Sequence, residues 1–195
     1  MPELIQQELD ALTFGARDDE AKERLGELML YVADQCADDP TFGATKLNKV
    51  LYFSDLLAYA HFAAPISGCQ YMRLDHGPAP RHLLPVRNQL IESGDAINRE
   101  RTYGGFEQNR LVPLRPANID RFTPSQIKLV DEVVAFFKGV SASQVSEFSH
   151  DRVWEIAEEN QGNIPYEAIF ISDDGVTEED HKYLKALDSE NAKPN

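Results

Sequence analysis

The stretch from Ala44 to Phe62 restricts the fold of this chain more than any other part of it. Apolar residues recur there at helical spacing and cover most of the helix circumference: Leu47, Val50, Leu51, Tyr52, Phe53, Leu56, Leu57 and Ala58. A helix that is apolar nearly all round is buried in the middle of a domain. The sequence therefore predicts a central helix around which the other elements pack.

Two lysines, Lys46 and Lys49, lie near the start of this expected helix. The N-terminal end of a helix carries partial positive charge, so it is the less favourable end for a cation. Two interpretations are open at this stage. The lysines are either two solvated side chains or a small basic surface that contacts a partner.

Three further helices are expected around the central one. An apolar stripe predicts a helix that begins at Asp18 or Asp19 and ends near Cys36. Leu83, Val86 and Leu90 mark the next helix, which has Pro85 in its first turn and ends at Gly94. The run from Thr123 to Gln126 has the pattern of a capping box and predicts a helix through Phe137.

The C-terminal part of the chain gives weaker helical signals. A second capping box at 141–144 predicts a short helix through Phe148, and Ser149 is suited to cap a further turn that ends at 162–166. A last, marginal helix is expected from Thr177 to Leu187.

Strand signals are few. Cys69–Leu74 reads as a short strand, and residues 77–80 read as a turn. Alternating residues from Ile97, a Gly104–Gly105 pair and a return through Leu114 predict a β-hairpin. The expected fold class is α+β: a mostly helical single domain with a small antiparallel β-sheet or hairpin.

The length of 195 residues fits one domain with a substantial core. We expect residues 1–17 to be a loosely held lead-in and residues 18–175 to form the domain. Residues 176–195 are expected to hold the C-terminal helix and a frayed tail.

The charge is strongly acidic, with a net value of −14. Such a chain repels phosphate backbones and anionic lipid and attracts basic proteins. Only residues 73–121 are slightly basic, at +2. The polar N-terminus lacks the pattern of a secretory signal and no apolar stretch is long enough to span a membrane, so a cytoplasmic protein is expected.

Residues with catalytic potential do not form a convincing set. His76 and His82 flank the 77–80 turn, but a metal site there lacks two further ligands. The pairs Asp75–His76 and His150–Asp151, with Asp173 or Asp174 downstream, contain the residue types of a metal-dependent phosphohydrolase. Such ligands are expected on long helices, which the sequence does not predict there. We therefore expect no catalytic residue, metal or cofactor, and we expect Cys36 and Cys69 to be reduced thiols.

The hairpin allows an alternative function. It carries interleaved basic and aromatic side chains: Arg99, Arg101, Arg110, Tyr103 and Phe106. This pattern resembles the wing of a winged-helix DNA-binding protein, and the alternative is a transcriptional regulator that uses residues 97–112. Glu100 and Glu107 dilute the basic charge, so nucleic acid is the less favoured partner.

Five motifs stand out when they are taken together: Lys46–Asp55, Pro65–Gly68 with Tyr71, His76–Pro80, Ser149–Asp151 with Trp154, and Ile164–Tyr166. In combination they resemble the Panacea domain family of SocA-like antitoxins and phage-associated proteins. The resemblance covers about residues 44–170.

The resemblance implies an antitoxin-like module that neutralises a cognate toxin by direct protein contact, without enzymatic activity. Rigid Gly-Pro turns that carry aromatic and arginine side chains suit interface anchors. The expected partner-binding residues are Lys46, Lys49, Tyr71, Arg73, His76, Pro78 and Arg81. A purely structural role for the same residues is equally open, and so are the identity of the toxin and the oligomeric state.

Overall fold

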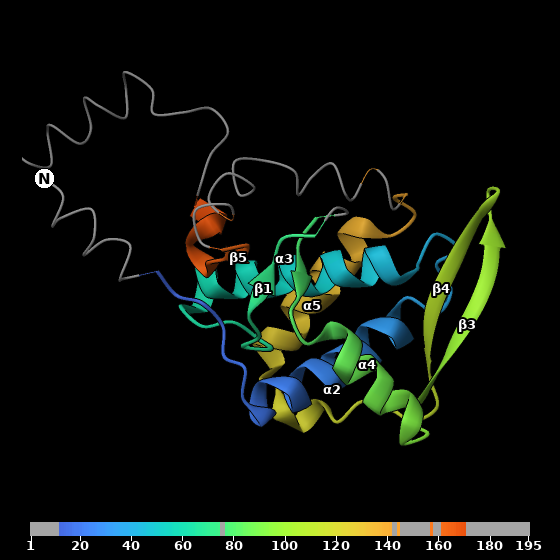
Figure 1. The fold of residues 1–195 in the computed structure, drawn as a ribbon, viewed down its shortest axis with the longest axis horizontal. Coiled ribbons are helices and arrows are strands. Elements are labelled where there is room, and N and C mark those ends of the chain that lie inside the picture. The colour runs from blue at the N-terminus through green and yellow to red at the C-terminus, as the bar shows by residue number, and fades with distance from the viewer. Residues whose placement is uncertain (1–11, 75–76, 142–143, 145–156, 158–160, 171–195) are drawn as a thin grey trace, which may run out of the picture.

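The computed structural model describes residues 12–74, 77–141, 144, 157 and 161–170 (Figure 1). In this part of the chain, helices predominate and strands are short, apart from one long hairpin. The expected class, a mostly helical α+β domain, is confirmed.

Helix α3, Ala44–Phe62, runs through the centre of the fold with the bounds that the sequence predicts. Residues on all sides of it are buried, polar ones included. Ala63 ends the helix in the left-handed conformation, with a φ of 55°.

Three further helices complete the helical part: α2 and α5 pack against α3, and α4 packs against α2. Helix α2, Asp19–Gln35, begins at Asp18, whose carboxylate accepts a hydrogen bond from the Ala21 amide. Helix α4 spans Leu83–Glu92. Helix α5, Pro124–Phe137, opens with both reciprocal hydrogen bonds of the Thr123–Gln126 capping box. These three predictions are confirmed to within a few residues.

The strands form two separate sheets, where the sequence indicated one. Strand β1, Tyr71–Met72, lies between β2, Ala79–Pro80, and β5, Asn163–Ile164, and both pairings are antiparallel. The second sheet contains only β3, Ala96–Tyr103, and β4, Phe106–Pro113.

Two local predictions are therefore corrected. The 77–80 segment is only partly a turn, because its second half pairs with β1 as β2. The 162–166 segment was expected only to stop a helix, but it supplies β5 and the start of the 3₁₀ helix η2, Tyr166–Phe170. Such two-residue strands are set by long-range pairing and leave no alternation in the sequence.

The ends of the chain are described only in part. Ala16 forms a parallel bridge with Cys69, and the Thr13 carbonyl accepts a hydrogen bond from the Tyr166 amide. Residues 12–17 thus contact the domain, and the boundary at residue 18 stays a prediction. Ser141 and Gln144 form the hydrogen bonds of the second capping box. The helices expected behind it and at 177–187 lie outside the described residues.

The apolar core has two parts that share α3. The larger part contains the buried faces of α2, α4 and α5 and the base of the hairpin. The smaller part is aromatic and joins Tyr52 of α3 to Tyr71 of β1 and Tyr166 of η2. A short 3₁₀ turn, η1 at Ile119–Arg121, connects the hairpin to α5.

A buried carboxylate ties the two parts together. Asp55 of α3 is 0 % exposed and accepts hydrogen bonds of 2.7 Å from each of the Ile66 and Ser67 amides. The Ser67 hydroxyl and the Tyr71 hydroxyl, the latter at 2.8 Å, also donate to it. These bonds fix the loop that leads from α3 into β1.

The chemistry of this site explains why the carboxylate is tolerated inside the protein. Burial raises the pKa of Asp55, while the hydrogen bonds from Ser67, Tyr71 and Ile66 act in the opposite direction. A buried charge is stable only when its hydrogen-bonding capacity is filled. The four donors supply that here.

Asp55→Ala is expected to destabilise the fold by roughly 3 kcal/mol or more, because it leaves two buried amides and two buried hydroxyls without an acceptor. Urea denaturation of the full chain measures the change. Asp38→Ala is the matched control, since Asp38 is exposed; its expected effect is below about 0.5 kcal/mol. Equal effects of the two substitutions would contradict the assigned role of Asp55.

Candidate interaction surface

Lys46 belongs to the interior of the protein. Its side chain is 1 % exposed, and its Nζ lies 2.8 Å from Asp39 Oδ2 and 2.9 Å from the Phe137 carbonyl. The Thr41 hydroxyl is a third partner. This ion pair joins the first turn of α3 to the loop after α2 and to the end of α5.

Lys49 is equally buried, but its ammonium group has fewer and longer polar contacts than that of Lys46. Its Nζ contacts the Pro78 carbonyl at 3.4 Å, and no acidic partner is present among the described residues. Burial lowers the pKa of Lys49 to about 8. Both lysines were expected at the surface, solvated or facing a partner, and this expectation is wrong because α3 is buried on all sides.

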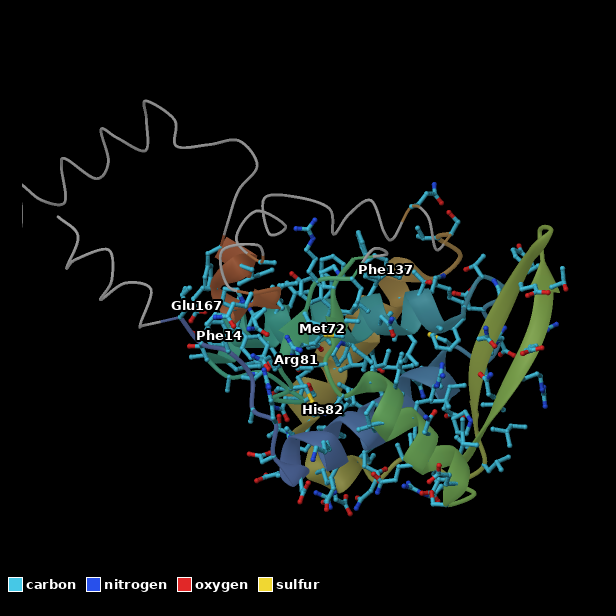
Figure 2. The ribbon with its side chains drawn as sticks, viewed as in Figure 1. Phe14, Met72, Arg81, His82, Phe137 and Glu167 are labelled. Carbon is cyan, nitrogen blue, oxygen red and sulfur yellow. The ribbon has the colours of Figure 1, made fainter. Side chains whose placement is uncertain are left out.

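The predicted 71–82 surface is mostly interior too. Tyr71 and Pro78 are buried, since β1 and β2 pack against α3, so their expected position on an outer face is wrong. Arg73 and Arg81 are half-buried, and Arg81 Nη2 donates to Asn163 Oδ1. Figure 2 shows Arg81 and His82 together at the start of α4. His76 lies outside the described residues.

The metal hypothesis gains no support from the described residues. They contain no cluster of three or more His, Cys, Asp or Glu side chains suited to a metal. His82 is half-buried, and burial together with the charges of Lys22, Arg17 and Arg81 lowers its pKa. The other histidines and carboxylates of that hypothesis, Asp75, His76, His150, Asp151, Asp173 and Asp174, lie outside the described residues. Cys36 and Cys69 are free and buried, as expected.

The most prominent exposed feature is the hairpin of β3 and β4, which we call the hairpin arm (residues 96–113). It projects beyond the helices, with β3 as the outer strand (Figure 1). Seven of the eight residues of β3 are exposed. Gly104 and Gly105 form the tip with φ angles of 58° and 85°, the left-handed conformation that a tight two-residue hairpin turn requires.

Arg110 attaches the hairpin arm to the domain. Its guanidinium donates hydrogen bonds of 3.0 Å to the carbonyls of Cys36, Ala37 and Asp39, which follow α2. Only 5 % of Arg110 is exposed. Its predicted role as an alternative nucleic-acid contact is therefore wrong, because the guanidinium is buried against these carbonyls and does not face solvent. The C-terminal carbonyls of a helix are natural acceptors for a cation, although sequence spacing alone did not indicate this pairing.

The register of the hairpin arm separates its charges by face. Arg99 pairs with Arg110 and Arg101 with Gln108, whereas Glu100 and Glu107 stand at alternate positions in the ladder. Side chains of neighbouring strand residues point to opposite faces. The arginines therefore share one face with Ile97 and Tyr103, and the glutamates lie on the other. The exposed Arg99 and Arg101 form no ion pair within the described chain.

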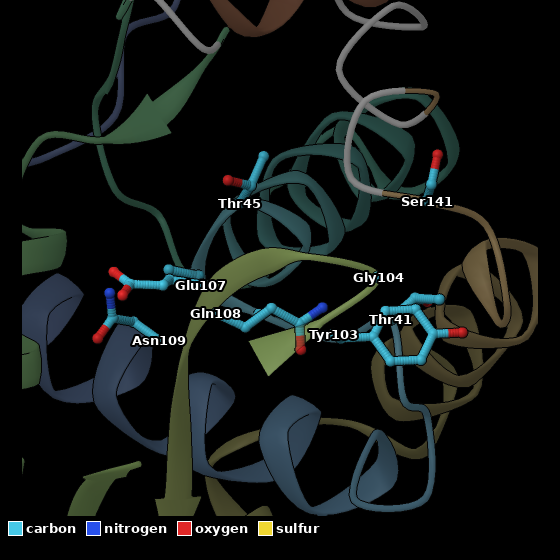
Figure 3. A pocket seen from close by; sticks show the side chains of 10 residues that line it. Thr41, Thr45, Tyr103, Gly104, Glu107, Gln108, Asn109 and Ser141 are labelled. Atoms are coloured by element: carbon cyan, nitrogen blue, oxygen red, sulfur yellow. The ribbon is translucent and has the colours of Figure 1, made fainter. Parts of the chain in front are cut away.

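The described residues line two grooves. One, of about 480 Å³, separates the hairpin arm from the first turn of α3; Figure 3 shows Gln108 and Tyr103 beside Thr41 in it. An apolar groove of about 420 Å³ lies between α3 and α5. Its lining includes Phe53, Leu57 and the 64 % exposed Phe136.

The comparison with family models gives one decisive match. The model of the antitoxin SocA-like Panacea domain matches residues 47–155, more than half of the chain. The chain belongs to this family. Comparisons with curated proteins and with solved structures give no match.

This Panacea domain begins its matched region inside α3 and includes the hairpin arm and α5. The match confirms the resemblance seen in the sequence. In the described part of the chain, none of the helices has the length and apolar character needed to cross a membrane.

Lys46→Met is expected to cost about 3–5 kcal/mol of stability at pH 7, because it leaves the Asp39 carboxylate buried without its cation. Burial raises the pKa of Asp39, but hydrogen bonds from Lys46 and Thr41 hold it below its ordinary 3.8. The stability from this pair is full above about pH 3.8, the ordinary pKa of the carboxyl in the unfolded chain, and is lost as pH falls below that value. The deficit of the variant should therefore persist down to about pH 4 and narrow towards pH 3.

Denaturation curves at pH 7 and pH 3 test this expectation. Lys22→Met is the control, since Lys22 pairs with Asp19 at the surface, where an ion pair contributes less than about 1 kcal/mol. A deficit at Lys46 that is as small as the control, or independent of pH, would contradict the buried pair.

Proposed function

We propose that this protein is an antitoxin that neutralises a cognate toxin by direct protein–protein contact and does so without catalysis. The observation that carries the proposal is the family match over residues 47–155. The family description names an antitoxin; the contact mechanism is our extension of it.

The buried charged side chains have structural partners inside the fold, and this supports a binding role for the protein. Asp55, Lys46 and Arg110 each make three or more hydrogen bonds with partners inside the fold. These bonds stabilise loops and helix ends. Such a scaffold holds exposed elements in place, which reduces the entropy lost when a partner docks.

The charge of the chain indicates what kind of toxin it attracts. A net charge of −14 accelerates association with a basic protein and slows association with polyanions. A toxin that acts on nucleic acid carries basic charge, so the proposed partner is of that type. Long-range attraction of this kind weakens as salt is raised.

The test is co-expression with the gene encoded beside this one. We expect the neighbouring product to arrest growth alone, to be tolerated together with this chain, and to copurify with it. The Asp55→Ala variant provides the control, because a destabilised antitoxin should rescue growth less well. Normal growth with the neighbour expressed alone would argue against antitoxin function.

A DNA-binding regulator is the second candidate, and one observation favours it: Arg99 and Arg101 share a face from which both glutamates are excluded. A two-stranded ribbon fits the major groove of DNA. Because Arg110 is hydrogen-bonded to the end of α2, only Arg99 and Arg101 are exposed arginines on that face. We therefore expect no retention on duplex DNA at 50–100 mM salt, a range in which phosphate contacts are strong.

An electrophoretic mobility assay with full-length protein and operon-derived duplex checks this. Binding that falls steeply with salt and is lost in the Arg99→Glu, Arg101→Glu double variant would favour the regulator. The double variant Lys128→Glu, Lys138→Glu is a charge-matched control at two exposed positions outside the hairpin arm.

A further inference from the structure

We infer that the outer edge of β3 is a docking site for an extended segment of a partner protein, which adds to the hairpin arm as a third antiparallel strand. The inference deepens the proposed function, since it names a contact surface on the antitoxin. It rests on that function only for the biological identity of the partner.

The main chain of β3 is available for such pairing. In a hairpin with a two-residue turn, Tyr103 and Phe106 exchange hydrogen bonds, and bonded and non-bonded pairs alternate from there. The non-bonded positions on β3 are therefore Asn98, Glu100 and Thr102, whose N–H and C=O groups point outward. Among the described residues, no hydrogen bond from outside the hairpin reaches them.

The side chains along this edge select what binds there. A strand added antiparallel to β3 meets Arg99 and Arg101 at non-bonded positions, where side chains approach most closely. Carboxylates two residues apart on the partner complement these arginines, and a lysine or arginine between them complements Glu100. The flanking Ile97 and Tyr103, 38 % and 46 % exposed, offer apolar contact at both ends.

A second copy of this chain is a poor occupant of the same edge. Two β3 strands related by a two-fold axis bring residues of the same face together, and their register centres on one residue. The registers that pair the middle of β3, centred on Arg99, Glu100 or Arg101, each place like charges opposite one another, which is destabilising. The edge thus opposes self-pairing over its full length, a known hazard of exposed strands, and favours a different chain as the occupant.

The experiment selects binders without using the toxin, so its outcome is separate from that of the co-expression test. A library of eight-residue peptides displayed between flexible linkers is panned on the immobilised full-length chain. We expect enrichment of peptides with acidic residues at positions i and i+2 and a basic residue between them. Affinities of enriched peptides are then measured on variants.

Two substitutions at one position separate main-chain from side-chain contacts. Glu100→Pro removes an outward N–H while keeping every bond of the β3–β4 ladder, and proline is tolerated at such edge positions. It should weaken peptide binding at least about tenfold. Glu100→Ala keeps the N–H and loses one charge, so a loss of no more than about fivefold is expected.

Charge reversal provides a test that does not alter the main chain. The Arg99→Glu, Arg101→Glu variant should lose the selected peptides and bind counterparts in which lysine replaces the two acidic residues while the basic residue between them is kept. Circular dichroism and amide exchange of the ladder verify that each variant is folded. Absence of enrichment, or equal binding to Glu100→Pro and the unchanged chain, would overturn the inference and leave the charges as mere protection of an exposed edge.

Discussion

The Asp55 carboxylate is the interaction on which the arrangement of this domain most depends. It lies in the middle of a mostly apolar helix, and it binds the amides and hydroxyls of the segment that follows that helix. Without these bonds, the loop at 64–70 keeps its hydrogen bonds to Ala16, Arg24 and Tyr166 but loses those to α3. The attachment of β1 and of the two strands paired with it to α3 is then weakened.

The same principle recurs at the other end of α3. Lys46 and Arg110 are cations that neutralise or bind groups at the ends of neighbouring helices. Each replaces contacts with water by several fixed acceptors, which is the condition under which a buried charge is tolerated. Three buried charged side chains therefore determine how helices, loop and hairpin meet, while the apolar core supplies the bulk of the stabilisation.

The sequence predicted the elements with strong local signals. The apolar periodicity of α3, the capping box at Thr123 and the glycine pair at the hairpin tip each act through nearby residues, and all were located correctly. Strand β5 and the roles of the buried cations depend on residues distant in the chain. Lys46 illustrates the difference, because only the folded structure brings the Phe137 carbonyl to its ammonium group. For the same reason, four of the seven residues expected to contact a partner at the surface are in fact buried: Lys46, Lys49, Tyr71 and Pro78.

The pairing of β1 has a consequence for how the chain folds during synthesis. One neighbour, β2, follows it closely, but the other, β5, and the tyrosine that completes the aromatic cluster come from residues 163–166. While residues 163–166 are still inside the ribosome, one edge of β1 has no strand to pair with. Because domains generally fold as units as they emerge, the native state is reached late in translation. Until then, the uncovered edge of β1 and the incomplete aromatic cluster leave the chain more open to proteolysis than the finished domain.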